Sequence, residues 1–362
     1  MKLTISISAL LLSGAHAKYT EKTVFAGDSF FSNFTFFTEE DPTKGAVSYQ
    51  PFDAAIQAGL IGRLSNGHVY MGVDHTNQTP KRPSVRIESK ENFNRGLLLA
   101  DISHMPASVC GTWPAFWMLG AGEWPYNGEI DILEGVNDQE KNAVTLHTTQ
   151  GCLIDDLNPK SPNANVQSRS GSFAARASNN QRRAEFGFFA GDLKTPDCDV
   201  AAKGQSKNAG CSIHAPDTLP TNDSVELNSY GTPFNKNGGG IYAMESTTDG
   251  INVWFMPYNA SSDLSSPLHP ATVFSDPKPE TWGTPIARFA GKGCNFEQKF
   301  KDLRIIFDTT FCGEWAGKVW EEGGCAKKTG VATCEEWVEK HPEEFKEAYW
   351  AVGRLAWYDK EA

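Results

Sequence analysis

The 362-residue chain lacks the short motifs that mark most other catalytic classes. It has no G-x-S-x-G nucleophile elbow, no H-E-x-x-H zinc motif and no phosphate-binding loop. None of its eight cysteines forms a C-x-x-C pair, and its eight histidines are scattered without ligand spacing. We therefore expect no metal site and no cofactor, and we set aside serine-hydrolase, zinc-protease and nucleotide-dependent mechanisms.

Basic charge and long apolar runs are also scarce. Lys and Arg number 33 against 44 Asp and Glu, which gives a formal net charge of −11. Nucleic acids and anionic membranes are bound by clustered basic side chains, so an acidic surface disfavours both partners. No internal run approaches the roughly 20 apolar residues that cross a bilayer. We expect no nucleic-acid partner, no membrane partner and a monomer.

The N-terminus has the pattern of a secretory signal peptide. Lys2 precedes an apolar run from Leu3 to Leu12, and Ala15-His16-Ala17 supplies an A-x-A cleavage site. We predict cleavage after Ala17, a mature domain over residues 18–362 and an extracellular location. The alternative is a buried N-terminal strand.

The cysteines and the sequons fit a secreted protein. Eight cysteines allow 105 pairings, and the sequence does not choose among them. The local pairs Cys198–Cys211 and Cys325–Cys334 are only guesses. Four N-x-S/T sequons predict glycosylation on surface loops; they begin at Asn33, Asn77, Asn222 and Asn259.

Short strands separated by turn residues predict an all-β fold in one domain. The runs Gly240 to Glu245 and Ile251 to Met256 flank an Asp-Gly turn, which is the strongest short hairpin signal. Short helices are expected near the C-terminus, at 334–338 and 342–349. The Ser-, Asn-, Gly- and Pro-rich stretch 152–240 predicts long loops tied by disulfides, with 161–180 the first candidate for disorder.

The stretch Gly128 to Gly135, GEIDILEG, concentrates three carboxylates in six residues. Side chains alternate faces along a strand, so Glu129 and Asp131 share a face while Glu134 would point the other way. One extra residue, a β-bulge between Asp131 and Glu134, would return Glu134 to the same face. The two Glu Cα atoms would then lie about 13 Å apart.

Paired carboxylates at this spacing suit glycoside hydrolysis. Inward-leaning Glu side chains can bring their carboxyl groups to about 5–5.5 Å, the separation of a retaining glycosidase. Crowded carboxylates raise one another's pKa, which favours a proton on the acid. A solvated surface strand or a calcium site are the alternatives. The aliphatic Ile130, Ile132 and Leu133 argue against both, because they indicate a buried opposite face and calcium loops are Gly-, Asn- and Asp-rich.

GEIDILEG together with GTWPAFWMLG, EWP, DPTKGAVSY, RPSVRI and LHTTQGC resembles glycoside hydrolase family 16. The resemblance is to the fungal endo-1,3(4)-β-glucanases, or laminarinases, and runs through most of the mature chain. It implies a β-jelly-roll sandwich of two antiparallel sheets with a concave glycan-binding cleft. It also implies retaining hydrolysis of β-1,3 and mixed β-1,3/1,4 glucans. Glu129 would be the nucleophile, Glu134 the general acid/base and Asp131 the assisting acid.

The same resemblance suggests residues that contact the glucan. A sugar ring packs its apolar face on an aromatic ring, so tryptophans of the matching motifs are candidates. Trp113 and Trp254 are instead assigned to the core. The substrate-binding candidates are His147, Trp117, Trp124, Tyr49, Arg86 and Trp282.

Two other functions remain open. A wall transglycosidase of the same family would pass the covalent intermediate to a sugar, but such members typically carry E-x-D-x-E and often an anchor. This chain has the longer E-x-D-x-x-E form and a polar tail from Tyr358 to Ala362. A glucan-binding lectin would lack the glutamates that are present here.

Overall fold

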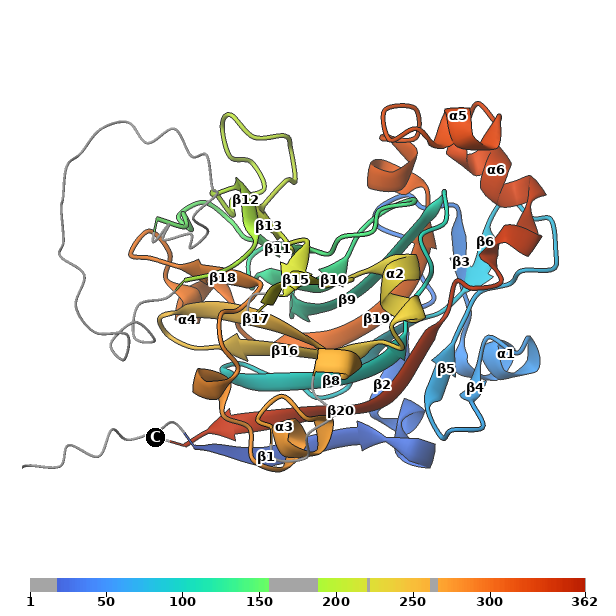
Figure 1. Cartoon of the computed structure of the whole chain (residues 1–362). Helices are drawn as coiled ribbons and strands as arrows, with labels where there is room; N and C mark the ends of the chain where they lie inside the picture. Colours follow the sequence, from blue (N-terminus) through green and yellow to red (C-terminus); the bar gives the residue numbers. More distant parts are fainter. Residues whose placement is uncertain (1–17, 156–187, 220–221, 261–265, 362) are drawn as a thin grey trace, which may run out of the picture.

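The computed structural model describes residues 18–155, 188–219, 222–260 and 266–361 (Figure 1). The predicted signal peptide at 1–17 and the stretch 161–180 lie outside the described residues. In the described ranges, no helix combines the length and the apolar character needed to cross a membrane.

Two antiparallel sheets of eight strands each pack face to face (Figure 1). Sheet A has the order β18 (Ala287–Ala290), β17 (Gly250–Pro257), β16 (Gly240–Ser246), β8 (Gly96–His104), β20 (Trp350–Lys360), β5 (Val69–Met71), β4 (Ile61–Arg63), with β1 (Tyr19–Ala26) also paired to β20. Sheet B has the order β12 (Asp192–Thr195), β13 (Cys211–His214), β11 (Ala143–His147), β10 (Glu129–Glu134), β9 (Thr112–Gly120), β19 (Leu303–Phe311), β7 (Arg86–Ser89), β2 (Phe34–Phe36). The predicted all-β sandwich is confirmed.

The core lies between the sheets because side chains alternate along each strand. Leu98 and Ala100 of β8 meet Phe116, Met118 and Ile130 of sheet B in one buried cluster. Each fully buried large apolar side chain stabilises the fold by about 1.5–3 kcal/mol. The intervening residues point away from the opposite sheet, toward what we call the outer face of sheet A and the outer face of sheet B.

The predicted hairpin is confirmed as β16 and β17. Their register runs from Gly240 opposite Pro257 to Ser246 opposite Ile251. The backbone N–H of Thr247 donates to the carbonyl oxygen of Gly250 at 2.9 Å, which closes the turn.

Short helices and two two-stranded sheets lie outside the two large sheets. The strand pairs are β14 (Thr218–Leu219) with β15 (Asn222–Glu226), and, in parallel, β3 (Val47–Tyr49) with β6 (Arg82–Ser84). The α-helices are α1 (Phe52–Gln57), α2 (Gly231–Lys236), α3 (Pro270–Ser275), α4 (Phe296–Lys299), α5 (Cys325–Thr329) and α6 (Cys334–Lys340). The π-helix η6 covers Gly313–Gly317, and the 3₁₀ turns are η1 (Gly27–Ser29), η2 (Phe31–Asn33), η4 (Tyr258–Ala260), η5 (Pro279–Thr281) and η7 (Pro342–Phe345). The two expected C-terminal helices correspond to α6 and η7.

Four disulfides tie loops to the sandwich. Cys198–Cys211 is confirmed, and Cys152–Cys294 lies on the same side. The guessed pair Cys325–Cys334 is wrong: the bonds are Cys110–Cys325 and Cys312–Cys334. The reason is that β9 and β19 are antiparallel neighbours, with Thr112 opposite Phe311, so Cys110 and Cys312 meet at one end of this strand pair. Cys110 bonds to Cys325 of α5, and Cys312 bonds to Cys334 of α6.

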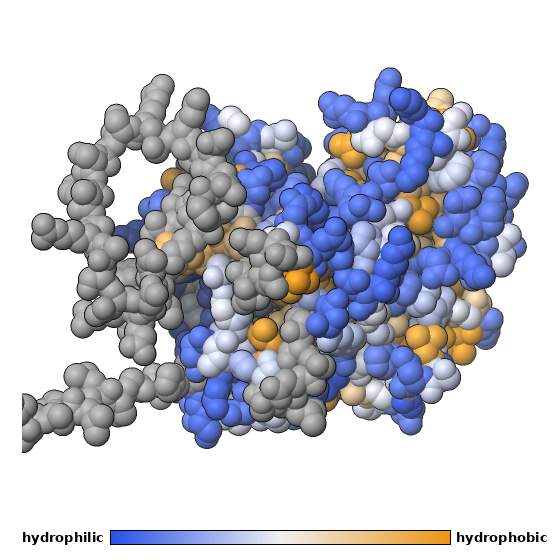
Figure 2. Space-filling model, viewed as in Figure 1, coloured by the Kyte–Doolittle hydropathy of each residue, from blue (hydrophilic) through white to orange (hydrophobic). Residues whose placement is uncertain are grey.

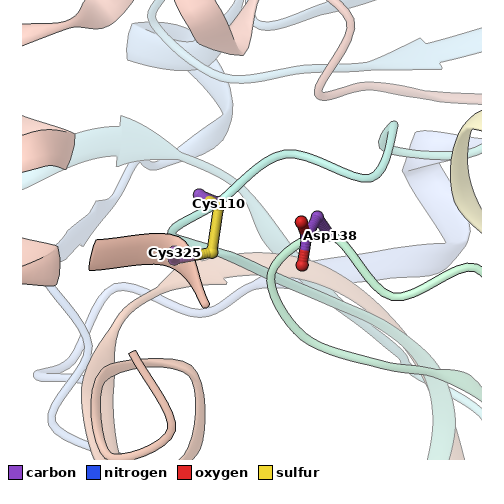
Figure 3. A group of neighbouring side chains, drawn as sticks. All are labelled: Cys110, Asp138 and Cys325. Carbon is purple, nitrogen blue, oxygen red and sulfur yellow. A yellow bond between two sulfur atoms is a disulfide. The ribbon is translucent and has the colours of Figure 1, made fainter. Parts of the chain in front are cut away.

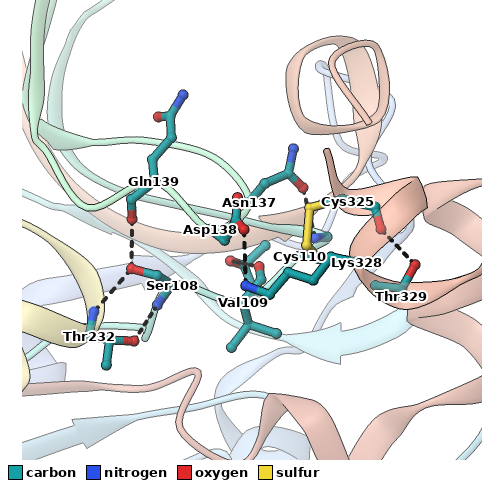
Figure 4. A network of polar contacts seen from close by, with 12 residues as sticks. Ser108, Val109, Cys110, Asn137, Asp138, Gln139, Thr232, Cys325, Lys328 and Thr329 are labelled. Atoms are coloured by element: carbon teal, nitrogen blue, oxygen red, sulfur yellow. Dashed lines mark hydrogen bonds and ion pairs between the residues drawn. A yellow bond between two sulfur atoms is a disulfide. The ribbon is translucent and has the colours of Figure 1, made fainter. Parts of the chain in front are cut away.

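Polar contacts strengthen this attachment. Asp138, which faces the Cys110–Cys325 bond in Figure 3, pairs with Lys328 of α5 at 2.9 Å. The neighbouring Asn137 accepts a hydrogen bond from the Gly111 backbone through its Oδ1 at 2.8 Å, as part of the network in Figure 4. The C-terminal helices are thereby fixed beside the strands that carry the acids.

Candidate active site

A β-bulge places the three acids of β10 on one face. Asp131 lies opposite Trp117 of β9 and Glu134 lies opposite Ala115, with a register shift directly after Asp131. Three steps along β10 therefore match two along β9, so Ile132 is the extra residue. Because Trp117 and Ala115 are two residues apart and share a face, Asp131 and Glu134 do too. The predicted bulge is confirmed.

The side chain of Asn142 stabilises the bulge. β11 pairs with β10 only from Glu129 to Asp131. Past that point the Glu134 N–H donates to Asn142 Oδ1 at 2.9 Å, and Asn142 Nδ2 donates to the Ile132 carbonyl oxygen at 2.7 Å. A buried N–H or C=O group left without a hydrogen bond would lower the stability of the fold by about 1–3 kcal/mol. No motif singled out this residue, since an asparagine before a strand is ordinary turn chemistry.

Glu129 sits between an indole and an imidazole. Its Oε2 accepts a hydrogen bond from Trp124 Nε1 at 2.9 Å, and its Oε1 lies 3.8 Å from His147 Nε2. Strand pairing places His147 directly opposite Glu129. Burial, followed by the Asp131 carboxyl, raises the pKa of Glu129 to about 7, while His147 and the Trp124 hydrogen bond act in the opposite direction.

Asp131 is the most buried of the three acids, with 3% of its surface exposed. Its Oδ2 lies 3.2 Å from His147 Nε2. Burial, reinforced by the charge of Asp308, raises the pKa of Asp131 well above its usual range. A protonated carboxyl group is a hydrogen-bond donor as well as an acceptor.

Glu134 is held by Trp113, whose Nε1 donates to Oε1 at 2.7 Å. Burial and the Asp131 charge raise the pKa of Glu134 well above its usual range, while the Trp113 hydrogen bond acts in the opposite direction. The assignment of Trp113 to the core was wrong. Trp113 shares the face of Ala115 and Trp117 on β9, and its ring meets Trp315 edge-on at 5.5 Å between centroids.

A cavity of about 250 Å³ lies over these residues. It opens where the surface dips between the β12–β13 side and the C-terminal helices (Figure 2). The lining includes the three acids together with Asp41, Pro42, Thr43, Arg86, Trp113, Ala115, Trp117, Leu119, Trp124, Asn208, Asp308, Thr310 and Glu314. A concave site with indole faces and buried acids is what binding and cleaving a sugar chain requires.

A fourth buried acid, Asp308 of β19, was not foreseen. Its Oδ1 accepts from Trp117 Nε1 at 2.8 Å and its Oδ2 accepts from Tyr49 OH at 3.1 Å. Burial raises the pKa of Asp308 to about 6, against the effects of Arg86 and the Trp117 hydrogen bond. A lone aspartate in LRIIFD gave no motif by which to find it.

Arg86, Trp117 and Trp124 line the cavity where the sequence predicted them. The Arg86 guanidinium lies over the Trp117 ring, 4.9 Å from its centroid, and donates to Glu88 Oε1 through Nη2 at 2.8 Å. Tyr49 does not line the cavity. It is buried, and it reaches the site only through its hydrogen bond to Asp308, so the expected direct contact with glucan is corrected.

Trp282 is misplaced in the sequence prediction. It is 4% exposed and packs edge-on against Trp254, with 5.6 Å between ring centroids, in the cluster on the outer face of sheet A. The whole sandwich separates it from the acids, because that cluster uses Leu97 and Leu99 rather than the inward-facing residues of β8. The loop sequence carried no signal of which sheet it covers. Trp254 is confirmed as a packing residue.

Two groups of side chains in the described ranges have the proximity of metal ligands. Candidate ligand atoms of Glu129, Asp131 and His147 all lie within 4.8 Å of one another. The two acids and the imidazole stand beside the cavity with Glu134, an arrangement that suits general acid/base chemistry. The other group pairs Asp138 with Cys110 and Cys325, whose sulfurs are joined in a disulfide and offer no thiolates.

Comparison with known proteins agrees with this geometry. The model of an XgeA-like, catalytic GH16 domain matches residues 34–189 and 175–358. An endo-1,3(4)-beta-glucanase of Arthroderma benhamiae is 38% identical over 98% of this chain and 68% of its own length. The endo-1,3(4)-beta-glucanase xgeA of Emericella nidulans is 34% identical over 98% of this chain and 50% of its own length. The chain thus spans between about half and two thirds of these two relatives.

Solved structures give the same result. Laminarinase 16A from Phanerochaete chrysosporium, with 6-O-glucosyl-laminaritriose in donor and acceptor sites, superposes with a TM-score of 0.75 at 34% identity. That alignment covers 95% of this chain and all of the other. An elongating GH family 16 beta-1,3-glucosyltransferase gives a TM-score of 0.74 at 36% identity, over 94% of this chain and all of the other. The two-sheet sandwich is therefore a β-jelly roll of the laminarinase type, and the chain belongs to glycoside hydrolase family 16.

Proposed function

We propose that the protein is a retaining endo-β-glucanase that acts on β-1,3 and mixed β-1,3/1,4 glucans. The observation that carries the proposal is the bulged strand, which sets Glu129 and Glu134 on one face of a cavity, each with its own indole donor. The substrate class follows from the relatives, which are named endo-1,3(4)-beta-glucanases.

Burial and the Asp131 carboxyl raise the pKa of both glutamates, that of Glu129 to about 7. We assign Glu129 as the nucleophile and Glu134 as the general acid/base, as the match to the family 16 motif implies. In the first step the Glu129 carboxylate attacks the anomeric carbon while the glycosidic bond breaks, and Glu134 gives its proton to the leaving oxygen. In the second step Glu134 takes a proton from water, which displaces Glu129 from the anomeric carbon. Asp131, on the same face as the two glutamates, is the assisting acid.

The test is reducing-sugar release from laminarin and from barley glucan, with NMR of the first product. We expect the β-anomer to form first, because two displacements retain configuration. Glu129→Gln should abolish release while glucan binding persists. An α-anomer as first product, or wild-type turnover by Glu129→Gln, would overturn the proposal.

Transglycosylation is a second candidate, because the solved relative at 36% identity is an elongating glucosyltransferase. The same glycosyl-enzyme would then be resolved by a sugar hydroxyl in place of water. Product lengths at low and high laminari-oligosaccharide concentration separate the two. Chains longer than the substrate that dominate at both concentrations would favour the transferase.

We also propose secretion and glycosylation. In support, the four disulfides suit an oxidising compartment. Asn77 and Asn259 are exposed, and Asn33 is half-buried with its Nδ2 donating to the Ser29 carbonyl oxygen at 2.8 Å. The Asn222 side chain lies outside the described part of the chain. N-terminal sequencing and mass spectrometry before and after deglycosylation of the secreted protein test both, with Lys18 expected first.

A further inference from the structure

We propose that Asp308 is a positioning residue that fixes the Trp117 indole as the sugar platform beside the catalytic acids. This inference rests on the proposed function and deepens it. It stands on strand register, on two hydrogen bonds and on the charges around the carboxylate.

Register places Asp308 in the same cross-strand row as the acid/base. Ala115 of β9 lies opposite Glu134 on one side and opposite Asp308 on the other. Strands are spaced about 4.8 Å apart, so the Glu134 and Asp308 backbones lie roughly 10 Å apart with a small alanine between them. Both acids therefore line the cavity floor, and the space above Ala115 is bounded by a carboxyl on each side.

Trp117 is held from two directions. Its Nε1–H donates to Asp308 Oδ1 at 2.8 Å, which fixes the edge of the ring, and the Arg86 guanidinium lies over the ring at 4.9 Å. The ring is only partly buried and lines the cavity, so packing alone does not define its orientation. A hydrogen bond to a buried acceptor is the contact that sets the angle of the indole.

Asp308 is itself fixed from a separate element. Tyr49 of β3 donates its hydroxyl to Asp308 Oδ2 at 3.1 Å, and Tyr49 is buried. Arg86 directs its Nε and Nη2 donors to Glu88 Oε1, at 3.1 and 2.8 Å, and Glu88 Oε2 in turn meets Arg304 at 2.7 Å. Each Asp308 oxygen thus accepts one hydrogen bond, from Trp117 or from Tyr49. This arrangement is typical of a carboxyl group that orients a neighbouring side chain.

The test compares Asp308→Ala and Asp308→Asn, each alone and combined with Trp117→Phe. We expect Asp308→Ala to lower kcat/KM on laminarin about 30-fold, mainly through KM, because the platform contacts the sugar in ground state and transition state alike. Asp308→Asn keeps an oxygen acceptor for the indole, so its kcat/KM should lie within about fivefold of the wild-type value. Adding Asp308→Ala to Trp117→Phe should cost no more than about twofold, because the positioned N–H is already gone.

Asp101 supplies a matched control on the outer face of sheet A. Asp101 is half-buried and, like Asp308, accepts a hydrogen bond from a tyrosine, in this case Tyr258. Asp101→Asn should leave kcat and KM within twofold of wild type.

Three outcomes would overturn the proposal. The loss of kcat/KM in the double variant could equal the product of the losses in Asp308→Ala and Trp117→Phe. Alternatively, kcat/KM in Asp308→Asn could stay as low as in Asp308→Ala, or Asp308→Ala could keep the wild-type KM. The indole N–H resonance of Trp117 gives a readout that needs no turnover. It should shift in Asp308→Ala and return toward wild type in Asp308→Asn. Failure of glucan hydrolysis in the wild type, with the Trp117 resonance shifting as expected, would defeat the proposed function and leave the positioning role standing.

Discussion

Tryptophans on the outer face of sheet A and on the outer face of sheet B are used in different ways. On sheet A, Trp254 is buried against Trp282, and its Nε1 donates to the Gly283 carbonyl oxygen at 3.1 Å. On sheet B, Trp113 and Trp117 line a cavity, and their Nε1 atoms donate to the carboxylates of Glu134 and Asp308. In this packed pair on sheet A the indole N–H satisfies a backbone acceptor, whereas on sheet B two indole N–H groups hold the side-chain carboxyl groups of the site. The tryptophans on sheet A therefore contribute to stability, and those on sheet B position the acids.

Removing the acid from sheet B should have the largest effect. Glu134→Ala should lower kcat on laminarin about 10³-fold, near 4 kcal/mol, because the leaving oxygen loses its proton donor. The loss should be far smaller on an aryl β-glucoside with an acidic leaving group, which departs without a proton. Steady-state kinetics on both substrates is the measurement, and an equal loss on both would contradict the acid role.

Removing the packed tryptophan from sheet A should alter stability instead. Trp282→Ala should lower the free energy of unfolding by about 3–5 kcal/mol, because a large buried side chain leaves a cavity. The kcat of the folded fraction should stay at the wild-type value. Denaturant unfolding together with active-site titration tests this, with Trp124→Ala, 40% exposed in the wild type, as the stability control. A fall in kcat without a loss of stability would instead indicate that Trp282 acts in the active site.

Asp308→Asn should change how stability depends on pH. A carboxyl whose folded pKa is raised to about 6, above its unfolded value of about 3.9, binds protons more tightly when folded. It therefore destabilises the fold progressively as pH rises from about 4 to 6. Relative to wild type, the variant should gain up to about 3 kcal/mol between pH 4 and pH 7. Denaturant melts at the two pH values measure this, and a relative loss would reverse the sign we assign.

The smallest effect should come from removing one indole donor at a time. Trp124→Phe removes the hydrogen bond that lowers the pKa of Glu129, so the acidic limb of kcat/KM should move up by about half a pH unit, near 0.7 kcal/mol. Trp113→Phe removes the corresponding bond to Glu134 and should move the basic limb up by a similar amount. Full pH–rate profiles distinguish the two. A shift of the same limb in both variants would argue against separate roles.

The sequence predicted the features that depend on local alternation. Two-residue periodicity set the faces of Glu129 and Asp131, and the odd spacing to Glu134 required the bulge that the register shows. The Asp-Gly turn between two apolar runs was enough to predict β16 and β17. These features need only the geometry of one strand or one turn.

Features that depend on which strands become neighbours could not be predicted. Asp308 and Tyr49 meet although 259 residues separate them, and the partners of Cys325 and Cys334 follow from the pairing of β9 with β19. For the same reason Trp282, predicted to bind substrate, is a packing residue, and Trp113, predicted to lie in the core, lines the cavity. A tryptophan in a loop is assigned to a sheet only once the chain is folded over it.

The disulfides at Cys152 and Cys198 have a consequence for a cleaved chain. These two residues bound the segment that includes 156–187; Cys152 is bonded to Cys294, 142 residues away, and Cys198 to Cys211, 13 residues away. The Cys198 N–H also donates to the Cys152 carbonyl oxygen at 2.9 Å, so the two ends are held together independently of what lies between them. A chain cut between Cys152 and Cys198 would therefore stay in one piece until the Cys110–Cys325 and Cys152–Cys294 bonds are both reduced.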